Sequence, residues 1–170
     1  YITNLIYNEE YTKAKNAKLD GLYIVHNGAW VGRIAKQARE LGLTAQLFGQ
    51  YATESSDLVS VGGDALEGLV YSFPLNESQL TEAQKEFIAK FEKRTGGRPQ
   101  IAAYNAYDIY YILANGIAEC QGKAPTCISD YIFSLKNYDG VGGTVSFSKD
   151  RLIRTFFFKQ VRNGQLVKYD

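Results

Sequence analysis

The chain has 170 residues, and its 19 basic and 18 acidic side chains leave a formal net charge of +1. That balance gives no indication of a surface built to bind nucleic acid, an anionic membrane or a polyanion, and a hydrophobic content of 45% is ordinary for a globular protein. The apolar runs all fall short of the roughly 20 residues that a membrane span requires.

Strands and helices alternate in the first two thirds of the chain. Short apolar runs predict strands over residues 2–7, 22–25, 45–48 and 68–73. Helices are expected over residues 9–18 and 55–61. Another helix is expected between the second and third strands, where apolar side chains recur at helical spacing before a C-terminal cap at Gly42; these are Val31, Ile34, Ala35, Ala38 and Leu41.

Three more helices are predicted in the middle of the chain. The first opens with Thr81 and Gln84, which fit a capping box, and stops at Gly96. The other two are expected over residues 101–120 and 128–135, where apolar side chains recur at helical spacing.

The tail is rich in strand-forming residues. Its Asn163-Gly164 pair predicts a type I′ hairpin turn, because both residues tolerate the positive φ angles that this turn requires. Alternating strands and helices joined by right-handed crossovers build a parallel sheet covered by helices. The sequence therefore predicts an α/β fold with a parallel, Rossmann-like sheet and a C-terminal β hairpin.

Thirteen tyrosines and nine phenylalanines are the unusual feature of the composition. They suit either a bulky core or the wall of a ligand cleft. Four of the tyrosines lie in the predicted helix over residues 101–120. We assign Tyr104, Tyr107, Tyr110 and Tyr111 mostly to the core, with Tyr104, nearest the helix start, as the candidate that faces the cleft.

Six residues separate the two cysteines, Cys120 and Cys127, and several of the six are turn formers. A loop of this size can bring two Cα atoms within the about 4.4–6.8 Å that a disulfide needs, which favours a disulfide and an oxidising compartment. Two unrelated thiols are the alternative. A metal site is not expected, because one such pair without nearby histidines supplies only two ligands.

A ligand site in an open parallel sheet lies outside the carboxyl ends of its strands. The exit of the strand over residues 22–25 carries His26, Asn27, Gly28 and Trp30. Asn27 and Gly28 fit a tight turn into the following helix, whose first backbone N–H groups could face an anionic group. The next exit carries Tyr51, a strong candidate for a ligand contact because its ring can stack while its hydroxyl forms hydrogen bonds.

Several of these residues also have plainer interpretations. Asn27-Gly28 suits turn chemistry alone, His26 suits a hydrogen-bonded rim residue better than a base, and Trp30 suits a cap on the core. Motifs of nucleophilic, phosphate-binding, dinucleotide-binding and zinc-dependent enzymes are absent from the sequence. We therefore expect a binding protein without catalytic residues, metal or cofactor.

Four segments, in this order, resemble the type I periplasmic solute-binding proteins of ABC importers, in the branch that binds leucine, isoleucine, valine and related amides. The segments are GAWVGRIAKQARELGL (28–43), GDALEGLVYSFP (63–74), FEKRTGGRPQIAAYNAYDIYYILANGI (91–117) and YDGVGGTVSFSKDRLIRTFFFKQVRNGQLV (138–167). The resemblance covers nearly the whole chain.

The resemblance implies a Venus-flytrap protein in which two α/β lobes, joined by hinge strands, close on a ligand. It implies that residues 1–137 form the second, C-terminal ligand-binding lobe, incomplete at its start, and that residues 138–170 form the hinge-returning strands and the terminal β hairpin. The chain matches roughly the C-terminal half of such proteins, so we expect the first lobe to be absent from it, and the start at Tyr1 without a signal peptide fits a mature product or a fragment. The resemblance also implies a periplasmic or extracytoplasmic location and an ABC permease as the membrane partner. Some members carry a disulfide in the loop that holds Cys120 and Cys127.

Carried over position by position, the family's ligand contacts fall at or near His26, Asn27, Gly28, Trp30, Tyr51 and Gln100. Tyr51 occupies the position that often holds an acidic partner for an α-amino group, and Glu54 lies close to it in sequence. The expected ligand is a small polar molecule such as an amino acid or an amide. A ligand-sensing domain of a receptor or regulator is the alternative function, and an α/β enzyme of unusual chemistry is a more distant one.

Overall fold

The computed structural model describes residues 12–121, 124–149 and 151–169, and the chain forms two compact units. The first unit comprises Tyr1–Phe73 with Phe158–Asp170, and the second comprises Pro74–Phe157. These limits differ from the predicted division after residue 137, because the chain leaves the first unit after its third strand and returns to it near the end. The predicted strand over residues 2–7 lies outside the described residues, and of the predicted helix over residues 9–18 the structure describes a helix at residues 12–16.

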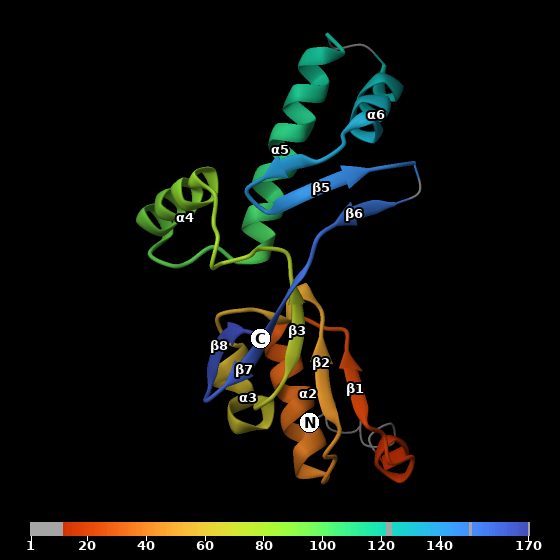
Figure 1. The fold of residues 1–170 in the computed structure, drawn as a ribbon, viewed down its shortest axis with the longest axis vertical. Coiled ribbons are helices and arrows are strands. Elements are labelled where there is room, and N and C mark those ends of the chain that lie inside the picture. Colours follow the sequence, from red (N-terminus) through yellow and green to blue (C-terminus); the bar gives the residue numbers. More distant parts are fainter. Residues whose placement is uncertain (1–11, 122–123, 150, 170) are drawn as a thin grey trace. The chain divides into compact units, whose positions relative to one another are not determined.

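The first unit is a five-stranded sheet with helices on one face (Figure 1). Its strands lie in the order β1 (Gly21–Ile24), β2 (Gln46–Gly49), β3 (Val70–Phe73), β7 (Phe157–Arg162) and β8 (Gln165–Lys168). β1, β2 and β3 pair in parallel, and β7 and β8 form an antiparallel hairpin. The prediction of an α/β fold with a mostly parallel sheet and a C-terminal hairpin is confirmed.

The connections between these strands are helical. α2 (Gly28–Glu40) joins β1 to β2, while η1 (Tyr51–Thr53), α3 (Leu58–Gly62) and η2 (Gly63–Leu66) join β2 to β3. The apolar face that the sequence predicted for α2 is buried, and its members are Val31, Ile34, Ala35 and Ala38. They pack in the same core as Leu47, Leu58, Leu66 and Leu69, which are all fully or almost fully buried.

The opposite face of the sheet is not covered by the described helices. Tyr23 and Phe48 stand opposite each other in the register of β1 and β2, and their side chains are 59% and 40% exposed. With Phe158 and Tyr169 they line a groove of about 420 Å³. Parallel sheets normally have both faces buried. An uncovered face such as this one is therefore expected to pack against another part of a protein.

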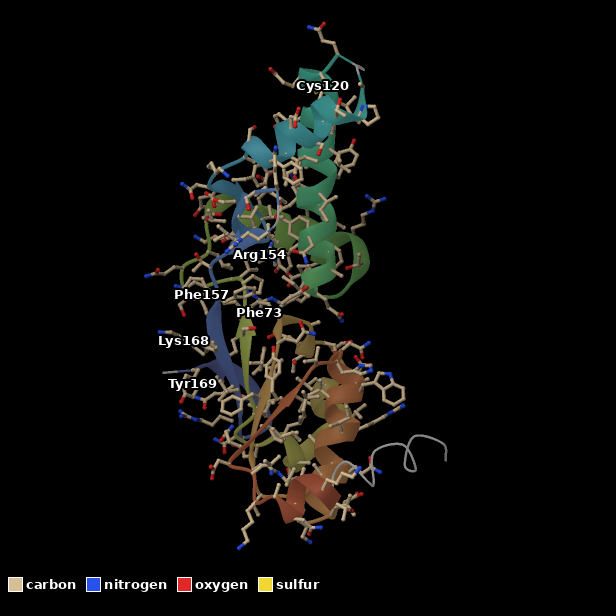
Figure 2. The ribbon with its side chains drawn as sticks, turned by 90° about the vertical axis from the view of Figure 1, so that its right-hand side faces the viewer. Phe73, Cys120, Arg154, Phe157, Lys168 and Tyr169 are labelled. Carbon is tan, nitrogen blue, oxygen red and sulfur yellow. A yellow bond between two sulfur atoms is a disulfide. The ribbon has the colours of Figure 1, made fainter. Side chains whose placement is uncertain are left out.

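The second unit holds three helices and a small antiparallel sheet (Figure 1). The helices are α4 (Glu82–Thr95), α5 (Ile101–Glu119) and α6 (Pro125–Ser134), and the sheet is β4 (Tyr138–Gly140), β5 (Gly143–Phe147) and β6 (Leu152–Arg154). The disulfide between Cys120 and Cys127 fastens the end of α5 to α6 (Figure 2). The three-stranded sheet was not predicted as a unit, because its strands have only three to five residues each.

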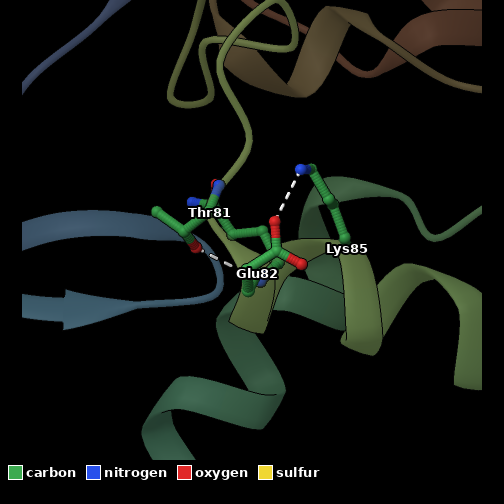
Figure 3. Close-up of polar contacts among 4 residues, drawn as sticks. Thr81, Glu82 and Lys85 are labelled. Carbon is green, nitrogen blue, oxygen red and sulfur yellow. Dashed lines mark hydrogen bonds and ion pairs between the residues drawn. The ribbon is translucent and has the colours of Figure 1, made fainter.

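Short sequence motifs form the predicted local structures in both units. Thr81 and Gln84 form the predicted reciprocal capping box at the start of α4, beside an exposed ion pair between Glu82 and Lys85 (Figure 3). At the hairpin, Asn163 and Gly164 have φ angles of 53° and 68°, as the type I′ turn requires. Among the described residues, the helices are too short or too polar to span a bilayer.

The tyrosines of α5 are distributed against expectation. Tyr104 is 2% exposed and packs against Phe87, with ring centroids 5.1 Å apart. Tyr107, Tyr110 and Tyr111 were assigned to the core, but they are 41%, 67% and 42% exposed in this chain, so that assignment is wrong here. The reason is helical phase, because Tyr104 lies in the buried row of α5 with Asp108 and Ile112, whereas Tyr107 lies at the edge of that row, with its ring 4.9 Å from Phe87.

Candidate functional site

The exits of β1 and β2 lie side by side in the first unit. Gly28, the first residue of α2, packs directly on the loop that follows β2. A Cβ atom added to Gly28 would lie 1.8 Å from the Ser55 hydroxyl oxygen and 2.7 Å from the Thr53 carbonyl oxygen. The glycine is therefore required for this close approach, and the two exits form one continuous patch, as the parallel topology predicted.

Aromatic and cationic side chains occupy the exit of β1. The rings of His26 and Trp30 are 5.3 Å apart, and the guanidinium of Arg33 lies 5.0 Å from the centre of the Trp30 ring. The backbone N–H of Asn27 donates to Nδ1 of His26 over 2.9 Å. Because Nδ1 accepts this bond, a neutral His26 carries its proton on Nε2, the other ring nitrogen.

The exit of β2 combines one half-buried tyrosine with buried hydroxyls. Tyr51 opens η1, and the side chain of Gln50 accepts the backbone N–H of Ala52 at the start of that turn. The hydroxyls of Thr53 and Ser55 are buried without a hydrogen-bond partner among the described residues. Unsatisfied buried hydroxyls are uncommon, and these two lie against glycines: a Cβ atom added to Gly49 would be 2.4 Å from the Thr53 hydroxyl oxygen, and the Ser55 hydroxyl packs on Gly28. Sequence reasoning selected neither Thr53 nor Ser55.

Glu54, in the same loop, belongs to a buried polar cluster. Its Oε2 atom lies 2.7 Å from Nζ of Lys159 and accepts the hydroxyl of Tyr71. Nζ of Lys159 also lies 4.6 Å from the centre of the Phe73 ring. The side chains of Lys159 and Glu54 are 8% and 21% exposed, so the ion pair is largely shielded from water. Sequence reasoning missed this cluster, because Lys159 is far from Glu54 along the chain and nothing local pairs them.

The remaining predicted site residues belong to the second unit. Gln100 is exposed and occupies the position before α5, and Tyr104 is buried within α5. The structure therefore gathers His26, Asn27, Gly28, Trp30 and Tyr51 at the two exits of the first unit, and Gln100 and Tyr104 belong to the second unit.

A groove of about 540 Å³ lies in the second unit, beside α4 and α5. Phe87, Phe91, Tyr107, Tyr111 and Tyr138 supply most of its apolar wall. This groove lies where the large side chains of α5 are uncovered. It is not lined by any of the predicted ligand residues, so we treat it as a packing surface.

Asp108 is the buried carboxylate of the second unit, and its role is structural. It accepts the backbone N–H groups of Val141 and Gly142, each over 2.8 Å, and so fastens the β4–β5 turn to α5. Burial raises the pKa of the Asp108 carboxyl above its ordinary value, although both N–H groups and the charge of Arg154 oppose the rise. Within the described residues, no group of three histidine, cysteine, aspartate or glutamate side chains is arranged to hold a metal ion.

Comparison with known proteins gives a consistent result. The family model described as "Periplasmic binding protein" matches residues 7–165. The leucine-, isoleucine-, valine-, threonine- and alanine-binding protein of Pseudomonas aeruginosa is 22% identical over 152 residues, which are 89% of this chain and 40% of that protein.

Solved structures show the same fold. A leucine binding protein from Thermotoga maritima superposes with a TM-score of 0.82 at 22% identity, over 96% of this chain and 47% of that one. A branched-chain amino acid transporter substrate binding protein from Streptococcus pneumoniae, in complex with isoleucine, gives a TM-score of 0.75 at 21% identity, over 94% of this chain and 46% of that one. The chain thus spans less than half the length of each of these proteins.

Proposed function

The chain belongs to the periplasmic binding protein family, and on that premise we propose that the full-length protein captures a small polar ligand, such as an amino acid or an amide, between two lobes and delivers it to an ABC importer. The family and the transport-associated relatives support a solute-binding role outside the cytoplasm. They also support a binding protein rather than an enzyme.

The observation that carries this proposal is the contact between the two strand exits of the first unit. Gly28 brings the loop after β1 against Thr53 and Ser55 of the loop after β2. The aromatic rings and backbone groups of these two exits can hold a small molecule by stacking and hydrogen bonding. None of this requires a reactive side chain, which suits reversible capture.

The proposed mechanism is closure of the lobes on the ligand. A ligand that gains contacts to both lobes only in the closed state shifts the population toward that state. The permease would then recognise the closed form. The first unit supplies one set of contacts, so the chain alone should bind the ligand much more weakly than the full-length protein.

We propose that the rest of the full-length protein covers the apolar surfaces that this chain leaves exposed. α5 carries exposed apolar side chains on several sides, including Ile109, Tyr110 and Ile117, and a helix that is apolar all round is normally buried. The uncovered sheet face with Tyr23 and Phe48 is a second such surface. The relatives are more than twice as long as this chain, which leaves enough polypeptide to cover both.

Isothermal titration of the full-length protein against amino acids, amides, organic acids and sugars tests the solute-binding role. We expect one chemical class to bind with a single site per protein. If no member of a broad panel binds while circular dichroism shows a folded protein, the proposed function is wrong. Transport of the bound compound by membranes that contain the cognate permease, and loss of that transport without the binding protein, would identify the importer.

A further inference from the structure

We propose that Asn27 is a site of spontaneous modification, at which the loss of its amide nitrogen adds a carboxylate to the loop after β1. Asparagine followed by glycine deamidates readily, because a glycine, which has no Cβ atom, leaves its backbone nitrogen open to the asparagine side chain. The chain holds three such pairs, which begin at Asn27, Asn115 and Asn163. Their backbone surroundings differ, and those of Asn27 favour the reaction.

Asn27 lies at the start of α2 rather than inside it. Its backbone is extended, with φ −83° and ψ 164°, and its exposed side chain makes no capping hydrogen bond. Gly28 is the first helical residue, so its N–H has no acceptor within the helix, and none of the described residues accepts it. The positive end of the helix dipole also favours the negative charge that develops when this nitrogen loses its proton.

The reaction consumes water and needs no other reagent. The nitrogen of Gly28 forms a bond to the side-chain carbonyl carbon of Asn27. The bond from that carbon to the amide nitrogen breaks, and the amide nitrogen leaves as ammonia with the proton of Gly28. Water then opens the cyclic imide at one of its two carbonyl carbons. One opening gives aspartate, and the other gives isoaspartate, in which a side-chain carbon has become part of the backbone.

The two products have opposite effects on the contact between the exits of β1 and β2. Aspartate keeps the backbone and places a carboxylate before α2, whose first turn has no acidic residue, so it stabilises the helix. Isoaspartate lengthens the backbone directly before Gly28, where a single added Cβ atom would already lie 1.8 Å from the Ser55 hydroxyl oxygen. Isoaspartate therefore forces the two exit loops apart. Both products add a negative charge to the candidate site, whichever ligand it binds.

The other two pairs serve as internal references. Gly116 lies inside α5, where backbone N–H groups bond to carbonyls one turn earlier, so Asn115 reacts only after the helix opens locally. Asn163 is exposed in the hairpin turn, and its own N–H donates to Glu67 over 3.0 Å. Glu67 precedes β3, at the edge of the parallel sheet opposite to the exits, so a reaction at Asn163 leaves the candidate site unchanged.

Peptide mapping of the full-length protein by mass spectrometry, after storage at mildly alkaline pH, tests the proposal. Asn27 should deamidate at least about tenfold faster than Asn115, because no helix has to open for its reaction. An isoaspartate-specific methyltransferase should label the peptide that contains Asn27. Equal retention of Asn27 and Asn115 overturns the proposal, and so does deamidation of Asn163 without that of Asn27.

Two variants test the structural consequence. Stored Asn27→Gln should keep its melting temperature, because glutamine closes such a ring far more slowly, and it controls for changes elsewhere in the chain. Asn27→Asp should melt at or above the temperature of the fresh wild type, since it reproduces the aspartate product. The isoaspartate form of the wild type, separated by ion exchange, should melt below both variants. If it melts with them, the predicted separation of the exit loops is wrong.

Discussion

The ion pair between Glu54 and Lys159 makes a quantitative prediction about stability. Glu54→Gln removes the carboxylate that pairs with Lys159, whose side chain is 8% exposed. Breaking a buried pair in this way costs about 3–5 kcal/mol. The glutamine can still accept the hydroxyl of Tyr71, Lys159 keeps its contact with Phe73, and Glu54 is partly hydrated, so we expect a loss of about 2–3 kcal/mol of unfolding free energy.

Calorimetric melting of the full-length protein measures the effect. A loss of this size should lower the melting temperature by roughly 2–4 °C, because the shift per kcal/mol falls as a protein grows and the relatives are more than twice as long as this chain. Glu82→Gln is the matched control, because it breaks an ion pair of the same 2.7 Å length whose carboxylate is 90% exposed (Figure 3), and it should cost less than about 1 kcal/mol.

The double variant Glu54→Gln with Lys159→Met should be more stable than Glu54→Gln alone, since it also removes the buried ammonium group that has lost its Glu54 partner. The reasoning is refuted if Glu54→Gln melts within a degree of the control. It is also refuted if the two substitutions at the pair destabilise additively.

Three further predictions concern other parts of the chain. Gly28→Ala should destabilise the protein by about 1–3 kcal/mol and weaken ligand binding, because the new methyl group collides with the neighbouring exit loop; denaturant unfolding and titration of the same sample measure both effects. Thr81→Ala should cost about 1 kcal/mol by removing the α4 capping box, measured by chemical denaturation, and Thr81→Ser should retain most of that stability. Burial raises the folded-state pKa of Asp108, so this carboxyl favours folding most below its unfolded value of about 3.9, and its contribution is lost as the pH rises through the folded-state pKa. The stability of Asp108→Asn relative to the wild type should therefore improve between about pH 4 and neutrality in pH-dependent melts, and a difference that stays flat would contradict the burial argument.

Much of this protein was determined by short-range patterns in the sequence. The α2 stripe from Val31 to Ala38, the capping box of Thr81 and the Asn163-Gly164 turn each depend on residues a few positions apart, and all three are present. The alternation of strands and helices predicted a parallel sheet. In such a sheet the carboxyl ends of neighbouring strands, and the loops that follow them, lie at the same edge. The position of the candidate site therefore followed from the order of the elements.

The tertiary structure alone decided the features that depend on residues far apart in the chain. The pairing of Glu54 with Lys159 joins a loop after β2 to a strand near the C-terminus, and no local pattern encodes such a contact. The division into two units likewise required knowing that β7 returns to the sheet of β3. Burial of Tyr104 and exposure of Tyr110 depend on which side of α5 meets the rest of its unit, and an all-round apolar helix does not specify that side. Long-range packing also set the electrostatic character of the candidate site, because it brought Lys159 next to Glu54 and so neutralised the carboxylate in the loop after β2.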